Sequence, residues 1–177
     1  MKRIVLIYGL IAGAILSATF LITLPFHDAI GFDHAMVVGY TSMVLAFLLI
    51  YFGVRSYRDN VLGGTIRFGR ALGTGLLIAA VAGMCYVAMW QVVYYNFIPD
   101  YLDKYQAHVL EKARAEGATE EAIARQRAEM EDFARMYQNP AVNAAVTFLE
   151  PLPVSLLMAL ISAGVLSRRR GAGARAA

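Results

Sequence analysis

The sequence predicts an all-α membrane protein with four transmembrane helices and an extracytoplasmic helical hairpin between the third and fourth. Three observations favour this class: 59% of the 177 residues are hydrophobic, only 16% are charged, and the charges gather in blocks separated by long uncharged stretches. A soluble domain carries about 25% charged residues. A helix of about twenty residues covers the ~30 Å hydrocarbon layer, so each stretch is long enough to span a bilayer.

The predicted spans cover residues 4–24, 35–54, 71–95 and 141–166. The first three contain no charged residue, and the fourth contains a single one, Glu150. The first is longer than the apolar core of a secretory signal, which has about 7–15 residues, so we expect it to be retained. We expect residues 1–170 to form one four-span membrane domain and residues 171–177 to form a disordered cytoplasmic tail.

The distribution of Lys and Arg predicts on which side each connection lies, because these residues stay on the cytoplasmic side of a membrane. Basic residues precede the first span and follow the fourth, and residues 55–70 carry four arginines and one aspartate. Residues 25–34 contain no Lys or Arg, and residues 96–140 contain six basic and nine acidic residues. The alternation predicts that both termini are cytoplasmic and that residues 96–140 lie outside.

Residues 96–140 have the composition of water-exposed helices. Apolar residues recur at intervals of three and four on both sides of Gly117, which suits the left-handed end of a helix, and Thr119 is placed to cap the next one. This pattern predicts an antiparallel hairpin whose narrow apolar stripes face each other or the membrane surface. Its charged face is either simply solvated or a surface for a protein partner.

Small residues recur every four positions on the spans, as at Gly9, Gly13 and Ser17 on the first. Close backbone approach drives helix association in lipid, so these stripes predict a compact four-helix bundle. The same stripes are compatible with a homo-oligomer, and the sequence does not decide between the two.

The segment "TFLEPLPVSLL", residues 147–157, combines an acid with two prolines inside the fourth span. Pro151 and Pro153 remove backbone donors, so we expect the helix to kink there. Such a break is stable only against protein or water, which predicts that Glu150 faces the bundle interior or a wet vestibule. We expect Gln91, Tyr94 or Thr147 beside it.

Glu150 has two interpretations. Intramembrane acids often mark a pathway, which favours a proton or ion site. The other interpretation is an interfacial acid that fixes the kink. If Arg168 marks the inner boundary, Glu150 lies ~27 Å further out at helical rise, in the outer quarter of the membrane, which favours the structural role.

A metal site and a cofactor are not predicted. "HDAIGFDH" places His27, Asp28, Asp33 and His34 in one short connection, but their spacing matches no established metal site, and Asp33 is expected to cap the second span. The single cysteine, Cys85, excludes an intramolecular disulfide, a paired-cysteine zinc site and a haem-attachment motif.

Arginines border the spans on the predicted cytoplasmic side, and we expect them to contact anionic phospholipid headgroups. They are Arg55, Arg58, Arg67, Arg70, Arg168, Arg169 and Arg170. The net charge of +3 does not indicate nucleic-acid binding, because the outer block of residues 96–140 is acidic.

Four segments carry a resemblance to a known family. They are "YGLIAGAIL", "FGVRSYRDNVLGGTIRFGRALGTGLLI", "WQVVYYNFIPDYLDKY" and "TFLEPLPVSLL". The chain resembles, over nearly its whole length, the bacterial membrane family catalogued as domain of unknown function 4199. The resemblance implies a multi-pass protein of the bacterial inner membrane and supplies no activity or catalytic residue.

We therefore expect a structural or interaction protein. The alternative is a small channel or transporter component that uses Glu150. An enzyme is disfavoured, because no nucleophile and base, paired acids or metal spacing converge on one face.

Overall fold

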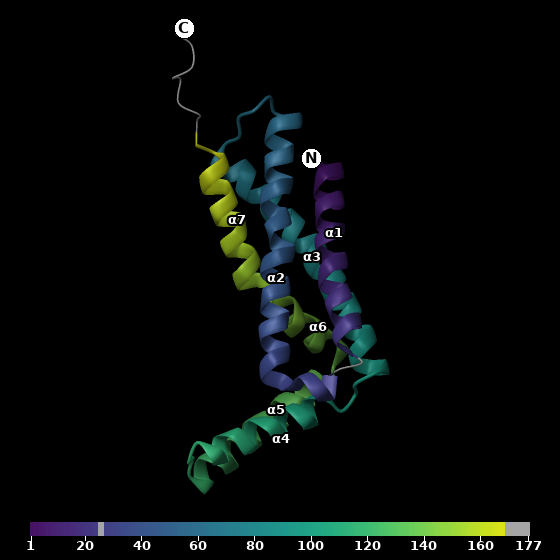
Figure 1. Cartoon of the computed structure of the whole chain (residues 1–177), viewed down its shortest axis with the longest axis vertical. Helices are drawn as coiled ribbons and strands as arrows, with labels where there is room; N and C mark the ends of the chain where they lie inside the picture. The colour runs from purple at the N-terminus through teal and green to yellow at the C-terminus, as the bar shows by residue number, and fades with distance from the viewer. Residues whose placement is uncertain (25–26, 169–177) are drawn as a thin grey trace.

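The protein is a helical bundle with a helical hairpin at one end (Figure 1). The computed structural model describes residues 1–24 and 27–168, with residues 27–30 described by their backbone alone. The helices are α1 (Lys2–Thr23), α2 (His27–Asn60), α3 (Phe68–Asn96), α4 (Tyr101–Ala115), α5 (Glu120–Tyr137), α6 (Pro140–Leu149) and α7 (Leu152–Leu166). No strand occurs among these residues, which confirms the predicted all-α class.

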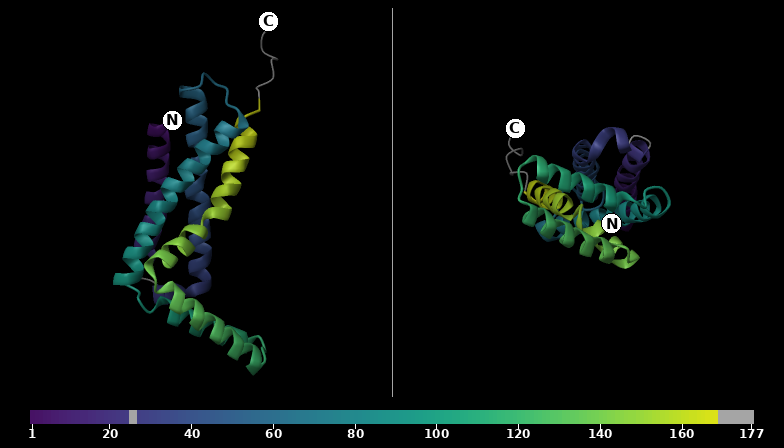
Figure 2. Two further views of the ribbon diagram at one scale, coloured as in Figure 1. Left: turned by 180° about the vertical axis from the view of Figure 1, so that it is seen from behind. Right: turned by 90° about the horizontal axis from the view of Figure 1, so that it is seen from below.

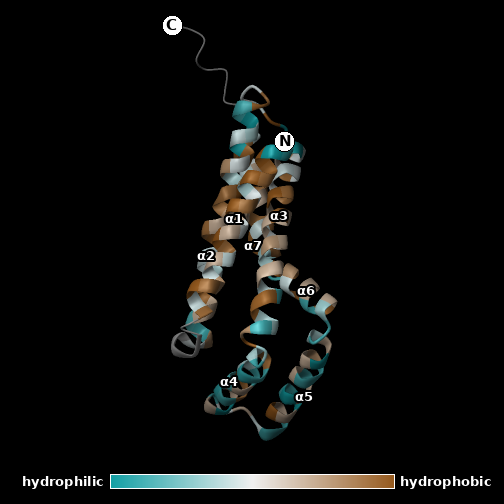
Figure 3. Ribbon diagram, turned by 90° about the vertical axis from the view of Figure 1, so that its right-hand side faces the viewer, coloured by the Kyte–Doolittle hydropathy of each residue, from teal (hydrophilic) through white to brown (hydrophobic). Residues whose placement is uncertain are grey.

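Four segments are long and apolar enough to cross a membrane, as predicted: Lys2–Thr23, Gly31–Asn60, Phe68–Asn96 and Pro140–Leu166. Apolar residues gather on α1, α2, α3 and α7, whereas α4 and α5 are mostly hydrophilic (Figure 3). Large apolar side chains such as Leu10, Leu45 and Leu157 stay exposed on the outside of the bundle. Exposed leucine is what a lipid-facing surface requires, so the chain is a multi-pass membrane protein.

Close helix contacts at glycine hold the bundle together. A Cβ added at Gly13 would lie 2.5 Å from Cys85 Cβ, and one at Gly9 would lie 2.6 Å from Val81 Cβ. Both contacts join α1 to α3, so the small-residue stripe predicted on the first span serves packing within this chain. The largest fully buried side chain, Phe47 of α2, belongs to the same core.

The start of α2 differs from the prediction. Residues 25–34 were expected to form a connection, but the helix begins at His27 and breaks at Gly31, whose φ of 69° and ψ of 161° are not helical. A positive φ is strained for residues with a side chain, and glycine accepts it. Asp33, predicted to cap the span, makes an ion pair with Lys112 of α4.

The fourth span consists of two helices, α6 and α7, that meet at Glu150 and Pro151. Asn139 caps α6 by accepting a hydrogen bond at Oδ1 from the Ala141 amide, 2.9 Å away. The two helices run at a visible angle (Figure 2), as the two prolines predict. α7 packs against α2 and α3, whereas α6 packs against α3 and α5.

The hairpin of α4 and α5 forms as predicted from local signals. Gly117 adopts a φ of 84° at the turn, and Thr119 Oγ1 accepts a hydrogen bond from the Ala122 amide. Leu110 and Ile123 are buried where the hairpin packs. The hairpin lies at the opposite end of the bundle from Met1 and the end of α7, and we call these the hairpin end and the arginine end (Figures 1 and 2).

Candidate functional site

A cavity of about 610 Å³ lies at the hairpin end, between the bundle and the hairpin. Its walls come from each helix from α1 to α6, together with Glu150 at the break before α7. The side of α4 that lines it contains Tyr101, Tyr105, His108 and Lys112, which are spaced by three and four residues. The amphipathic stripe of α4 is therefore directed at the cavity, and the hairpin forms its roof.

Aromatic side chains make up a large part of the cavity wall. Phe20, Tyr86, Trp90, Tyr101 and Tyr137 all line it, and we call them the aromatic cluster. The Phe20 ring centroid lies 5.0 Å from that of Tyr86 and 5.4 Å from that of Trp90. Tyr101 meets Trp90 edge-on at 5.2 Å. These separations are typical of favourable aromatic contacts, so the rings form one continuous surface.

Glu150 lies beside this surface. The Tyr86 hydroxyl donates a hydrogen bond to Glu150 Oε2 over 2.8 Å, and this bond joins α3 to the helix break. The Glu150 side chain keeps accessible surface and lines the cavity. The carboxylate is thus held by one neutral donor and is open to a molecule in the cavity.

The residues predicted beside Glu150 form a separate network. Gln91 Nε2 donates hydrogen bonds to Asn143 Oδ1 at 3.0 Å and to the Pro140 carbonyl at 3.2 Å. Thr147 Oγ1 lies 3.2 Å from the Tyr137 hydroxyl. Among the described contacts, none joins Gln91 or Thr147 to Glu150 by a hydrogen bond. This network fastens α6 to α3 and α5.

Tyr94, the third predicted neighbour, packs its ring edge-on against Tyr137 at 5.5 Å and does not hydrogen-bond to Glu150 in the described part of the chain. Sequence reasoning missed Tyr86, the actual partner of Glu150. The available signal was spacing, because Tyr86 precedes Trp90 by four residues and so shares its helix face.

The pKa values of two tyrosines of the hairpin, Tyr101 and Tyr137, lie above the usual value for tyrosine. Burial, and to a smaller extent the Glu150 carboxylate, raise the pKa of Tyr101 to about 12. Burial also raises the pKa of Tyr137, against the hydrogen bonds that Thr147 and Trp90 contribute. The Trp90 indole Nε1 donates to the Tyr137 hydroxyl over 2.8 Å.

Charged side chains at the cavity rim join the hairpin to α2. Lys112 Nζ lies 3.3 Å from Asp33 Oδ1, and His108 Nε2 lies 3.7 Å from the same oxygen. The Phe32 ring contacts the rings of Tyr105 and His108 at 5.5 and 5.2 Å. The rim therefore combines an ion pair with an aromatic contact.

The residues considered for a metal site are only partly described by the structure. The side chains of His27 and Asp28 lie outside the described residues, and Asp33 is engaged by Lys112. His34 is exposed. In the described parts of the chain, no group of three or more His, Cys, Asp or Glu side chains comes together as a metal ion requires.

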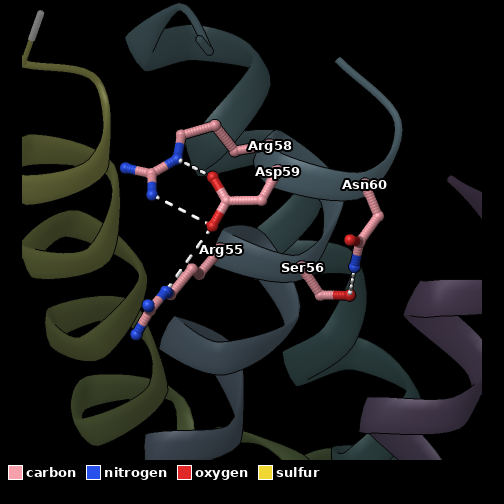
Figure 4. Close-up of polar contacts among 5 residues, drawn as sticks. All are labelled: Arg55, Ser56, Arg58, Asp59 and Asn60. Atoms are coloured by element: carbon pink, nitrogen blue, oxygen red, sulfur yellow. Dashed lines mark hydrogen bonds and ion pairs between the residues drawn. The ribbon is translucent and has the colours of Figure 1, made fainter. Parts of the chain in front are cut away.

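The arginines predicted to contact lipid headgroups differ in whether they already make ion pairs within the chain. Arg58 Nε donates to Asp59 Oδ1 at 2.7 Å, and Arg55 Nε lies 3.6 Å from Asp59 Oδ2 (Figure 4). One aspartate thus offsets part of this positive charge. Arg67, Arg70 and Arg168 are exposed at the arginine end, and Arg169 and Arg170 lie outside the described residues.

Comparisons with known proteins place the chain in a family. No curated protein gave a significant match, and no solved structure did. The sequence model of the family described as "Protein of unknown function (DUF4199)" matches residues 7–168. Because this match covers nearly the whole chain, the chain belongs to that family.

Proposed function

We propose that this membrane protein is a binding protein that accepts a small lipophilic molecule in the cavity beneath its hairpin. The observation that carries the proposal is the combination, in about 610 Å³, of continuous aromatic walls with one accessible intramembrane carboxylate, Glu150. Small-molecule sites are mostly apolar cavities of about 300–1,000 Å³ with a few convergent polar groups. The cavity has this size and this character.

The α2 side of the cavity supports entry from the membrane. Met36, Val38 and Tyr40 line the cavity and are 57%, 39% and 47% exposed. They belong to the apolar part of α2, so their exposed surface meets hydrocarbon in a bilayer. Tyr101 and Tyr105 of the hairpin cover the cavity from the other side. A molecule dissolved in the acyl chains reaches Glu150 without first crossing water.

The surroundings of Glu150 support binding over catalysis. Its hydrogen-bond partner is the neutral phenol of Tyr86. Acid–base or nucleophilic chemistry needs two reactive groups in contact, and among the described residues no carboxylate, thiol or imidazole is hydrogen-bonded to Glu150. We therefore place the protein with interaction proteins and propose no enzymatic activity.

A transporter component is the second candidate. It is favoured by the position of Glu150 at a helix break, because broken membrane helices often border substrate sites. Binding and transport are separable by experiment. A ligand that binds but shows no protein-dependent flux in proteoliposomes supports the first proposal alone.

We propose a bacterial inner-membrane location with both termini cytoplasmic, on the basis of the alternating charges. The arginine end then meets anionic headgroups, and the solvated face of the hairpin is free for a protein partner. In a Cys85→Ala background, an impermeant thiol reagent added to spheroplasts should label Glu120→Cys on the hairpin. It should not label Val61→Cys at the arginine end. The reverse labelling would contradict this orientation.

Trp90 allows a direct test of binding, because it is the single tryptophan of the chain and lines the cavity. A neutral bromophenyl alkane should quench Trp90 fluorescence saturably in reconstituted protein. Gly39→Phe should abolish the saturable part, since Gly39 lines the cavity and a Cβ there meets open space. Gly73→Phe is the matched control, because Gly73 also has open space but lies outside the cavity lining. Purely linear quenching, equal in both variants, would exclude a binding cavity.

A further inference from the structure

The charged residues that line the cavity limit the chemical class of ligand that it can bind. This inference rests on the proposed binding function. The charged lining residues are Asp33, Lys112 and Glu150, with His108 as a titratable group. Asp33 and Lys112 form an ion pair at the rim and offset each other. Glu150 remains, and no Lys or Arg among the described residues makes an ion pair with it. Apart from the Asp33–Lys112 pair, the cavity lining therefore offers one carboxylate without a cationic partner among the described residues.

A carboxylate at membrane depth is unfavourable unless it is paired. Its one hydrogen bond, from Tyr86, engages Oε2. A carboxylate that loses hydration there takes up a proton unless an opposite charge or further donors stabilise its charged form. A bound cation supplies that opposite charge, whereas a bound anion would add repulsion in a medium of low dielectric constant.

The aromatic cluster adds a second preference for positive charge. Aromatic faces attract cations, tryptophan most strongly, and quaternary ammonium groups are recognised in this way. The Tyr86 ring connects Glu150 to Phe20, and Phe20 in turn contacts Trp90. The carboxylate and the rings thus form one continuous lining that suits a positive centre with apolar substituents.

The α2 side of the cavity faces the membrane and therefore determines the solubility that a ligand needs. Met36 and Val38 at the α2 side are apolar and exposed, so a ligand that enters there must be soluble in hydrocarbon. A small hydrated cation does not meet this condition. We infer that the cavity binds a lipophilic organic cation, whose positive centre pairs with Glu150 and whose apolar substituents lie against the aromatic cluster.

Two probes test this inference on the full-length reconstituted protein through Trp90 fluorescence. The first is a lipophilic quaternary ammonium that carries a bromophenyl group, and the second is its neutral isostere, with carbon in place of nitrogen. We expect the cation to bind the unmodified protein roughly tenfold more tightly than the isostere. This comparison needs no variant, so it stands even if a substitution impairs folding.

Substitution at Glu150 then identifies the charge that is responsible. Glu150→Gln should weaken binding of the cation roughly tenfold and leave the isostere within about twofold. The control is Glu129→Gln, which removes the same charge from an exposed site on α5 and should leave both affinities unchanged. Equal affinities of both probes for the unmodified protein, or a cation affinity that Glu150→Gln does not change, would overturn the inference while the binding function stood. If neither probe quenches Trp90 fluorescence saturably, the inference and the proposed binding function are both wrong.

Discussion

The Tyr86 hydroxyl donates a 2.8 Å hydrogen bond to Glu150 Oε2, across a separation of 64 residues in the sequence. This contact joins α3 to the break between α6 and α7. It also fixes the carboxylate at the edge of the aromatic cluster. The hydrogen bond therefore fixes both the Glu150 carboxylate and the helix break relative to α3.

Removal of this hydrogen bond should cost stability. Tyr86→Phe keeps the ring and its contact with Phe20 but loses the donor, so we expect unfolding free energy to fall by about 1 kcal/mol. The measurement is reversible unfolding in mixed micelles. In a Glu150→Leu background the same substitution should cost less, because its partner is already gone. Strictly additive losses would show that the two side chains are not coupled.

Close packing at Gly13 should make even one added methyl group destabilising. A Cβ there would lie 2.5 Å from Cys85 Cβ and 2.8 Å from Cys85 Sγ, so α1 and α3 must separate in Gly13→Ala. Overpacking of this kind costs about 1–3 kcal/mol. Removal of the opposing side chain by Cys85→Gly should recover part of the loss.

Gly73→Ala is the matched control for Gly13→Ala, because a Cβ at Gly73 meets no atom within 4 Å. Alanine loses less conformational freedom in a helix than glycine, so this variant should be unchanged or more stable by up to about 1 kcal/mol. If both alanine variants lose equal stability, helix contact at Gly13 is not the cause.

Features encoded locally were predictable from the sequence. Charge-free length predicts the four spans, and the prolines after Glu150 predict the division into α6 and α7. Gly117 and Thr119 predict the hairpin turn. The start of α2 was not predicted, because hydropathy distinguishes water from lipid but does not distinguish a loop from a polar helical turn such as that at His27.

The site itself was less predictable than the fold. Gln91, Tyr94 or Thr147 was expected beside Glu150, whose depth was calculated along a straight helix. The partner, Tyr86, lies eight residues before Tyr94, or about 12 Å deeper at helical rise. A break in the helix and the tilt of α3 both change that depth, and neither is contained in composition. The cavity arises from how helices distant in sequence are placed, so no local pattern indicates it.

Thermal stability should decline at alkaline pH because Tyr101, on the hairpin side of the cavity, loses its phenolic proton. The pKa of Tyr101 is about 12 in the folded protein and about 10 in an unfolded chain, so the folded state retains the phenolic proton more strongly. Its contribution is complete below pH ~10 and is lost as the pH rises through about 12. Tyr101→Phe should flatten thermal stability over this range relative to the unmodified protein. An unchanged slope would show that Tyr101 titrates normally.

The ion pair between Asp33 and Lys112 should hold the hairpin against α2. Its atoms are 3.3 Å apart and both side chains are about half exposed, so water and salt screen the attraction and the pair weakens as ionic strength rises. Lys112→Asp places two acids together and should widen the distance distribution between spin labels on α2 and α4. The exchange variant, Asp33→Lys with Lys112→Asp, should restore the narrow distribution. If Lys112→Asp and the exchange variant give the same distribution, the Phe32 contacts alone hold the hairpin, and the charges do not position it.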